Sequence, residues 1–201
     1  MLKQFVYWVK HKIDIFFIRR KHVLIEDGAY IKRPYHIEGG EFIHVGQNVS
    51  ISAYSKLSCF SKYAGKDYNP TIQIGNNVFA NRFLTVLSAD KLIIGENTFL
   101  GSYVSITNEN HGITPGHTSF GLQPLTSEPV VIGNNCWIGD HVTILPGVTI
   151  GDWTIIGAGS VVTNSIPSFS IAVGVPARVK KKWDEESQSW KKYVRDDDEK
   201  Q

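Results

Sequence analysis

Residues 132–167 read IGNNCWIGDHVTILPGVTIGDWTIIGAGSVVTNSIP, and an Ile or a Val recurs there at every sixth position. The recurring residues are Ile132, Ile138, Ile144, Ile150, Ile156 and Val162, and a glycine directly follows four of them. An amphipathic helix would need spacings of three and four, and a strand a spacing of two. A period of six instead predicts short strands, each of which points one aliphatic side chain inward before the chain turns.

Three such strands make one coil of a triangular prism, so a coil takes about 18 residues. Each corner must turn the chain by about 120°, and Gly, Asn and Asp suit the corners because they accept unusual φ and ψ values at low cost. The repeat therefore predicts an all-β fold whose coils stack on one another, with the aliphatic residues in the centre.

The same signature occurs earlier in the chain, and its spacing locates the irregularities. The signature begins at Val45, Ile74, Ile94, Ile132 and Ile150, at intervals of 29, 20, 38 and 18 residues. Removing one 18-residue coil from each interval leaves 11, 2, 20 and 0 residues. The sequence thus predicts insertions at 60–70, 88–91 and 112–129. The six-residue spacing continues toward the N-terminus through Ile31, Ile37 and Ile43, which predicts about six coils in all.

Composition sets broad limits on what the chain is. The 201 residues are 42% hydrophobic, which suits one domain with a core, and a formal net charge of +2 gives no argument for nucleic-acid binding. Cys59 and Cys136 are too few for a disulfide framework, so a reducing cytoplasm is the expected setting. No signal peptide is visible, and no apolar stretch approaches the roughly 20 residues needed to span a bilayer.

The two ends differ in character from the repeat. Residues 1–25 are expected to form a helical cap over the prism, because Phe5, Val9 and Ile13 follow helical spacing. The aromatic and basic residues of 1–20 leave a second interpretation open, a peripheral contact with the inner face of a membrane. Residues 26–180 are expected to form the β-helix, and 181–201 a short helix and a solvated tail.

The stretch PVVIGNNCWIGDHVTILPGVTIGDWTIIGAGSVVTNSIPSFSIAVGVPARVKK, residues 129–181, resembles the hexapeptide-repeat sugar O-acetyltransferases. Galactoside, maltose and surface-polysaccharide acetyltransferases share its pattern, and the resemblance covers roughly residues 72–182. It implies a left-handed parallel β-helix, acetyl-CoA as the donor, no metal, and a homotrimer with active sites between subunits. It further implies a role in polysaccharide biosynthesis, with a small or lipid-linked sugar as the acceptor.

His111, in SITNENHGI, is the candidate for the chemistry. Acyl transfer to a sugar hydroxyl needs a base, since the hydroxyl is hardly ionised at neutral pH, and His titrates in that range. His111 stands directly before the longest insertion, and long loops in compact domains are usually functional. The resemblance implies that His111 removes the hydroxyl proton, so that the oxygen attacks the thioester without an acyl-enzyme.

The resemblance also supplies candidates for acceptor binding. Phe79 and Asn81, in the segment FAN, match an aromatic residue and an Asn that line the acceptor pocket of similar enzymes. Asp90 is a weaker candidate, because the two-residue insertion at 88–91, a small bulge, makes its alignment uncertain. Relatives often carry a pair of acidic residues there, whereas Ala89 precedes Asp90 in this chain.

The donor-side candidates fall on the C-terminal coils. The resemblance assigns a tryptophan and two small residues to the pantetheine arm, and two basic residues to the CoA phosphates, which Arg binds through its fork geometry. Two positions depart from the pattern, since Asp140 replaces a Ser or Ala and Asn164 replaces the usual Lys. The complete set is Trp137, Asp140, Ala158, Gly159, Asn164, Arg178 and Lys181.

Three other functions stay open at this stage. An N-acetyltransferase of an amino sugar would use the same base. A non-catalytic β-helix scaffold is a different class, against which the presence of both His111 and the GVPAR segment argues. A β-helical carbonic anhydrase would need three zinc-binding His residues. The available His111, His117 and His141 have an unconvincing spacing for that role.

Overall fold

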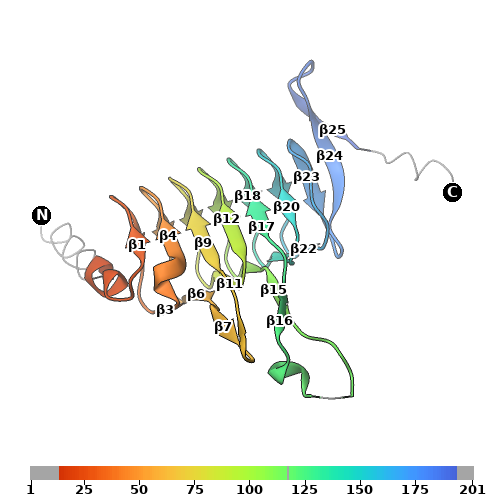
Figure 1. The fold of residues 1–201 in the computed structure, drawn as a ribbon. Helices are drawn as coiled ribbons and strands as arrows, with labels where there is room; N and C mark the ends of the chain where they lie inside the picture. Colours follow the sequence, from red (N-terminus) through yellow and green to blue (C-terminus); the bar gives the residue numbers. More distant parts are fainter. Residues whose placement is uncertain (1–13, 117, 194–201) are drawn as a thin grey trace, which may run out of the picture.

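The computed structural model describes residues 14–116 and 118–193, and they form a triangular prism of stacked coils (Figure 1). Its sides are three parallel sheets, here called A, B and C. Sheet A contains β1 (Leu24–Ile25), β4 (Ile43–Val45), β9 (Thr71–Ile74), β12 (Lys91–Ile94), β17 (Val130–Ile132) and β20 (Thr149–Ile150). Sheet C contains β3 (Tyr35–Glu38), β6 (Ser55–Cys59), β11 (Thr85–Ser88), β14 (Ser105–Thr107), β19 (Thr143–Ile144) and β22 (Val161–Val162).

Sheet B forms the third side and continues past the regular coils. Its strands are β2 (Tyr30–Ile31), β5 (Ser50–Ile51), β10 (Phe79–Ala80), β13 (Phe99–Leu100), β18 (Trp137–Ile138), β21 (Ile155–Ile156), β23 (Ser170–Val173), β24 (Arg178–Asp184) and β25 (Ser189–Lys192). The chain passes through A, B and C in turn and then repeats. Two short 3₁₀ helices, η1 (Gly40–Phe42) and η2 (Phe120–Leu122), lie outside the sheets.

The inward-facing residues of the repeat form the core, as the sequence predicts. Each of the six aliphatic residues at the six-residue spacing of the C-terminal coils is fully buried. In β19 the neighbouring Thr143 faces outward while Ile144 faces the core, which is the alternation of any strand. Burying one such Ile contributes about 1.5–3 kcal/mol, so the stack of aliphatic layers holds the coils together.

The A–B and B–C corners carry different residues in the same backbone conformation. Asn48, Asn77 and Asn97 occupy the A–B corner at positive φ, and the side-chain amide of Asn77 donates to Asn97 Oδ1 at 3.0 Å. The B–C corner also has positive φ but carries stacked rings, with centroids 4.5 Å apart for Phe83 and Tyr103 and 4.7 Å for Tyr103 and His141. The predicted preference for Gly, Asn and Asp thus holds at the first corner, whereas ring stacking occupies the second.

The third corner, where the chain leaves sheet C for sheet A, receives all three predicted insertions. The first forms the hairpin of β7 (Lys62–Tyr63) and β8 (Lys66–Asp67). The second is a short turn between β11 and β12. The third contains β15 (Glu109–His111) and β16 (Leu125–Ser127), which pair antiparallel. The insertions leave the sheets intact, since β12 still pairs in register with β17 across the longest of them.

The predicted C-terminal helix is wrong. Residues 178–184 and 189–192 form β24 and β25, an antiparallel hairpin that extends sheet B beyond β23. The free edge of β23 offers unpaired backbone groups, and pairing with β24 satisfies them. Trp183 and Trp190 face each other across the hairpin with ring centroids 5.4 Å apart, a contact that a helix would not make.

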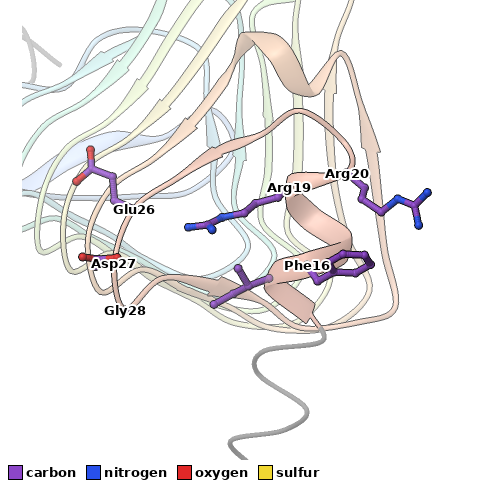
Figure 2. A pocket seen from close by; sticks show the side chains of 7 residues that line it. Phe16, Arg19, Arg20, Glu26, Asp27 and Gly28 are labelled. Atoms are coloured by element: carbon purple, nitrogen blue, oxygen red, sulfur yellow. The ribbon is translucent and has the colours of Figure 1, made fainter.

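At the N-terminal end, residues 14–19 are helical, and Ile18 is fully buried against the first coil. A recess lies between this helical turn and the corner after β1 (Figure 2), lined by Ile15, Phe16, Arg19, Arg20, Glu26, Asp27 and Gly28. None of the candidate site residues borders it. The predicted helical positions Phe5, Val9 and Ile13 lie outside the described residues, so the cap over 1–25 stays a prediction there. No helix in the described part of the chain is long and apolar enough to cross a membrane.

Candidate active site

His111 lies on an arm that projects from the C–A corner. We define the arm as residues 109–127, which comprise β15, β16 and the loop between them (Figure 1). His111 is the last residue of β15, its cross-strand partner is Leu125, and its side chain is exposed. Among the described residues, neither ring nitrogen of His111 has a hydrogen-bond or ion-pair partner. The described residues therefore leave both ring nitrogens open to a hydrogen-bonding group.

Asn108 anchors the arm to the prism, and sequence reasoning missed it. Its side chain is completely buried, donates to Ser88 Oγ at 3.1 Å and accepts from the backbone N–H of Ala89 at 2.9 Å. A buried amide with satisfied hydrogen bonds is a rigid junction, because leaving its partners unpaired costs about 1–3 kcal/mol. The sequence did offer a signal, because Asn108 stands where the strand would otherwise end in a small or aliphatic residue.

Gln123 closes the loop of the arm. It is 8% exposed, and its amide group donates to the carbonyls of Thr114 at 2.8 Å and Thr118 at 2.9 Å. Its Oε1 accepts from the Thr114 N–H at 3.0 Å. One side chain therefore holds the backbone of both Thr114 and Thr118.

The structure brings Asp90 to the base of the same arm. Its Oδ2 accepts from Ser127 Oγ at 3.4 Å, and its Oδ1 accepts from the Lys91 N–H at 2.7 Å. Ser127 is the cross-strand partner of Glu109, two residues before His111. A carboxylate thus lies on the corner from which the arm projects, although the two-residue bulge made its alignment uncertain.

Phe79 and Asn81 lie on a different part of the prism. Phe79 is 38% exposed on the outer face of sheet B, where its ring stacks on Phe99 with centroids 5.3 Å apart. Asn81 begins the B–C corner of the same coil. The whole of β11 in sheet C separates Asn81 from Asp90 along the chain. One copy of the chain therefore does not gather the predicted acceptor residues around His111.

The pantetheine-binding candidates follow sheet B and the B–C corner. Trp137 is 54% exposed on the outer face of sheet B, in register with Phe99. Ala158 and Gly159 are exposed at the B–C corner, and a Cβ at Gly159 would meet nothing within 4 Å. The Asp140 carboxylate is already engaged, since its Oδ1 accepts from the Ser102 N–H at 2.6 Å. These residues line one exposed strip.

A recess of about 400 Å³ at the C-terminal end brings Asn164 and Arg178 together. Lys182 and Tyr193 also line it, and the Lys182 ammonium lies 4.6 Å from the Tyr193 ring centroid. Because side chains alternate along a strand, Lys181 points to the other face of β24 and pairs with Lys192. The cations that line the recess are thus Arg178 and Lys182, and the role of Lys181 in binding CoA phosphates stays a prediction.

The two cysteines do not supply a nucleophile. Both are buried and free, and burial raises the pKa of the Cys59 thiol to about 12. Burial also raises the pKa of the Cys136 thiol. A thiol held neutral is a poor nucleophile. The described residues contain no group of three His, Cys, Asp or Glu side chains placed to hold a metal ion.

Comparison with known families and proteins gives consistent results. Residues 129–164 match the family described as bacterial transferase hexapeptide (six repeats). The chain is 32% identical to the putative lipopolysaccharide biosynthesis O-acetyl transferase WbbJ of Escherichia coli, over 81% of this chain and 83% of WbbJ. It is 44% identical to the galactoside O-acetyltransferase of the same organism, over 56% of this chain but only 54% of that enzyme.

Solved structures share the architecture. A galactoside acetyltransferase in complex with coenzyme A has a TM-score of 0.55 at 30% identity, covering 86% of this chain and 70% of that one. A mutant of AntD, an N-acyltransferase from Bacillus cereus in complex with dTDP-4-amino-4,6-dideoxyglucose and coenzyme A, has a TM-score of 0.65. Its identity is 20%, over 81% of this chain and 84% of AntD, so this second likeness shows a common fold alone.

Proposed function

The chain belongs to the hexapeptide-repeat acetyltransferase family, and from that membership we propose an acetyl-CoA-dependent O-acetyltransferase that modifies a sugar hydroxyl. The observation that carries the proposal is the exposed imidazole of His111 on an anchored arm, with no hydrogen-bond partner on either ring nitrogen among the described residues. The relation to WbbJ supports surface polysaccharide biosynthesis as the setting. The family also supports left-handed winding of the coils.

In the proposed reaction, neutral His111 accepts the proton of the sugar hydroxyl while that oxygen attacks the thioester carbonyl of acetyl-CoA. The tetrahedral intermediate collapses as its C–S bond breaks, and the imidazolium returns the proton to the departing CoA sulfur. No acyl-enzyme is formed, which agrees with the burial of both cysteines. The imidazole ends each cycle neutral and ready for the next hydroxyl.

We propose that the active site lies between two copies of the chain in a homotrimer. His111 and Asp90 belong to the C–A corner, whereas Phe79, Asn81 and Trp137 belong to sheet B and its B–C corner. A site that uses both groups needs the arm of one copy beside sheet B of the next. Exposed aromatic side chains on sheet B are suited to such a contact, since they cover large apolar areas.

The donor would lie along the strip of sheet B and the B–C corner. Trp137 would pack along the pantetheine arm, and Ala158 and Gly159 would let it approach the backbone. The recess with Arg178 and Lys182 would receive CoA phosphates, for which Arg has the fitting fork of N–H groups. Asn164, where relatives carry Lys, would contribute a hydrogen bond in place of a charge. A peripheral membrane contact through residues 1–20 stays a prediction.

The decisive assay supplies purified protein with acetyl-CoA and a thiol reagent over a panel of sugars, nucleotide sugars and amino sugars. We expect CoA release with hydroxyl acceptors, and a product whose acetyl group is removed by mild alkali, as an ester is. An alkali-stable product formed only from amino sugars would shift the function to N-acetylation. No CoA release with any acceptor, together with no CoA binding by calorimetry, would leave only a non-catalytic β-helix.

Subunit mixing tests the shared site. His111→Ala and Asn81→Ala should each be nearly inactive as pure proteins, because every site then lacks one contribution. When the two variants are co-expressed, mixed trimers contain some sites with both residues intact, and we expect activity to return. The control is Asn81→Ala produced alone, in which every subunit of the trimer carries the same substitution. Absence of recovery in mixed trimers, or a monomer by sedimentation, would contradict a site shared between copies.

A further inference from the structure

The first insertion forms a hairpin on the same side of the prism as the arm, although a full coil separates the two along the chain (Figure 1). β7 and β8 are joined by Ala64 and Gly65, whose φ values of 47° and 77° are those of a tight two-residue hairpin turn. Most of this hairpin is exposed. Tyr63 and the following Tyr68 are half-buried, and both contact the arm.

Tyr63 and Tyr68 hold the arm at two places around His111. The Tyr63 hydroxyl donates to the Gly121 carbonyl, and its ring packs against the His111 imidazole with centroids 5.4 Å apart and planes tilted by 56°. The Tyr68 hydroxyl donates to the Leu125 carbonyl at 3.1 Å, and Leu125 is the residue paired with His111 across the arm. One tyrosine ring therefore contacts the imidazole, and the other tyrosine holds the backbone of the residue paired with His111.

We propose that the 62–68 hairpin is a clasp whose Tyr63 and Tyr68 position the His111 imidazole for proton transfer. The proposal rests on the proposed function, in which His111 is the base. A two-stranded hairpin is marginally stable by itself in water, and β15 and β16 share only three residue pairs. Asn108 holds the base of the arm and Gln123 its loop, and the two tyrosines add support at the level of His111 itself. A misplacement of about 1 Å at a catalytic group can lower the rate roughly a hundredfold.

The two tyrosines act on His111 and not on the substrate. Each hydroxyl proton is already donated to a backbone carbonyl, so neither phenol is available as a general acid in this arrangement. The contact between the Tyr63 ring and the imidazole fixes the plane of the base, while the hydroxyl fixes the loop. Removing the ring and removing the hydroxyl are therefore separable changes with graded effects.

The test compares Tyr63→Phe, Tyr63→Ala and Tyr68→Phe with the matched control Tyr54→Phe, an exposed tyrosine of the B–C corner that does not contact the arm. We expect Tyr63→Ala to lower kcat by roughly ten- to a hundredfold. Tyr63→Phe and Tyr68→Phe keep their rings and should lose about fivefold, the worth of one ordinary hydrogen bond. The KM for acetyl-CoA and the affinity for CoA should stay within twofold, and Tyr54→Phe should equal wild type.

Adding Tyr63→Ala to His111→Ala provides the readout that a general structural role would not give. If Tyr63 acts through His111, the double variant should be no slower than His111→Ala within about twofold, because the effects of coupled residues do not add. The proposal would be overturned if the double variant lowers kcat by the product of the two single effects. A kcat for Tyr63→Ala within twofold of wild type would overturn it too.

A second measurement keeps the clasp testable even if the wild-type protein transfers no acetyl group, which would refute the proposed function. Hydrogen exchange of the arm backbone at 109–116 and 118–127 should be faster in Tyr63→Ala than in wild type, while exchange in β17, β18 and β19 should not change. Unchanged exchange in the arm would refute the clasp whatever the protein catalyses.

Discussion

Residues 130–162 and residues 56–128 build the same kind of coil, yet they differ at one corner. In the first region the chain crosses from sheet C to sheet A through the short turn at 145–148, where Gly147 has a φ of 78°. In the second region the same corner carries the clasp, the bulge with Asp90, and the arm with His111. The difference shows that the repeat supplies the scaffold and that its interruptions carry the candidate chemistry.

The interruptions leave the core unchanged. Ile94 pairs with Ile132 across the longest insertion, as Ile132 pairs with Ile150 where there is none. Corner residues face outward, so extra residues there add no volume to the aliphatic layers. Long surface insertions cost little free energy, because the closure entropy grows slowly with loop length. The prism can therefore carry functional segments without losing its register.

The largest expected effect comes from removing the proposed base, which lies in the region that carries the insertions. His111→Ala should lower kcat by roughly two to four orders of magnitude, as expected for a lost general base, and leave CoA affinity unchanged. Steady-state kinetics and calorimetry measure the two quantities. His36→Ala, at an exposed position of β3 in the first coil, is the control. If His111→Ala keeps activity within a factor of a few, another group is the base.

Removing a buried side chain from residues 130–162, the region without insertions, should affect the free energy of unfolding instead of kcat. Ile144 is fully buried, so Ile144→Ala should lower the free energy of unfolding by about 2–5 kcal/mol through lost burial and the cavity left behind. Ile113 on the arm is 83% exposed, and Ile113→Ala should change the free energy of unfolding by less than about 0.5 kcal/mol. Urea titrations at one protein concentration compare the two. Equal effects would mean that the arm belongs to the core.

The junction between the prism and the arm, at Asn108, should show an intermediate effect on the free energy of unfolding. Asn108→Leu removes the acceptor of the buried Ala89 N–H and the donor to Ser88 Oγ, which should cost about 1–3 kcal/mol. The exposed Asn110 offers the control Asn110→Ala, which should leave stability nearly unchanged. Thermal unfolding measures both variants, and hydrogen exchange should be faster at 109–116 in Asn108→Leu. A fully stable Asn108→Leu protein would show that the arm does not depend on this anchor.

The smallest expected effect lies beyond the regular region, on the C-terminal hairpin. Arg178→Ala should weaken CoA binding about tenfold, the worth of one charge-assisted contact of about 1.4 kcal/mol, without changing the free energy of unfolding. The affinity of wild type should also fall with added salt, since such contacts are partly screened. Lys192→Ala, on the opposite face of the hairpin from Lys182, serves as the control. An unchanged affinity in Arg178→Ala would place the phosphates elsewhere.

Much of the fold could be predicted because the six-residue period reports burial directly. The inward positions of Ile132 and Ile150 follow from counting, and both side chains are buried. The C-terminal hairpin could not be predicted in this way. The Lys-rich and Trp-containing segment after Arg178 has no repeat of its own, and the free edge of β23 decided its conformation.

The sequence by itself determined the six-residue period, the core-facing residues and the three insertions that interrupt the period. It also singled out His111, which stands directly before the longest insertion. Only the tertiary structure decided that all three insertions share one corner, that Tyr63 contacts His111, and that Asp90 and Asn81 lie on opposite sides of sheet C. The physical reason is that burial repeats locally along the chain. Contacts between insertions depend instead on how whole coils stack, which places residues dozens of positions apart at the same corner.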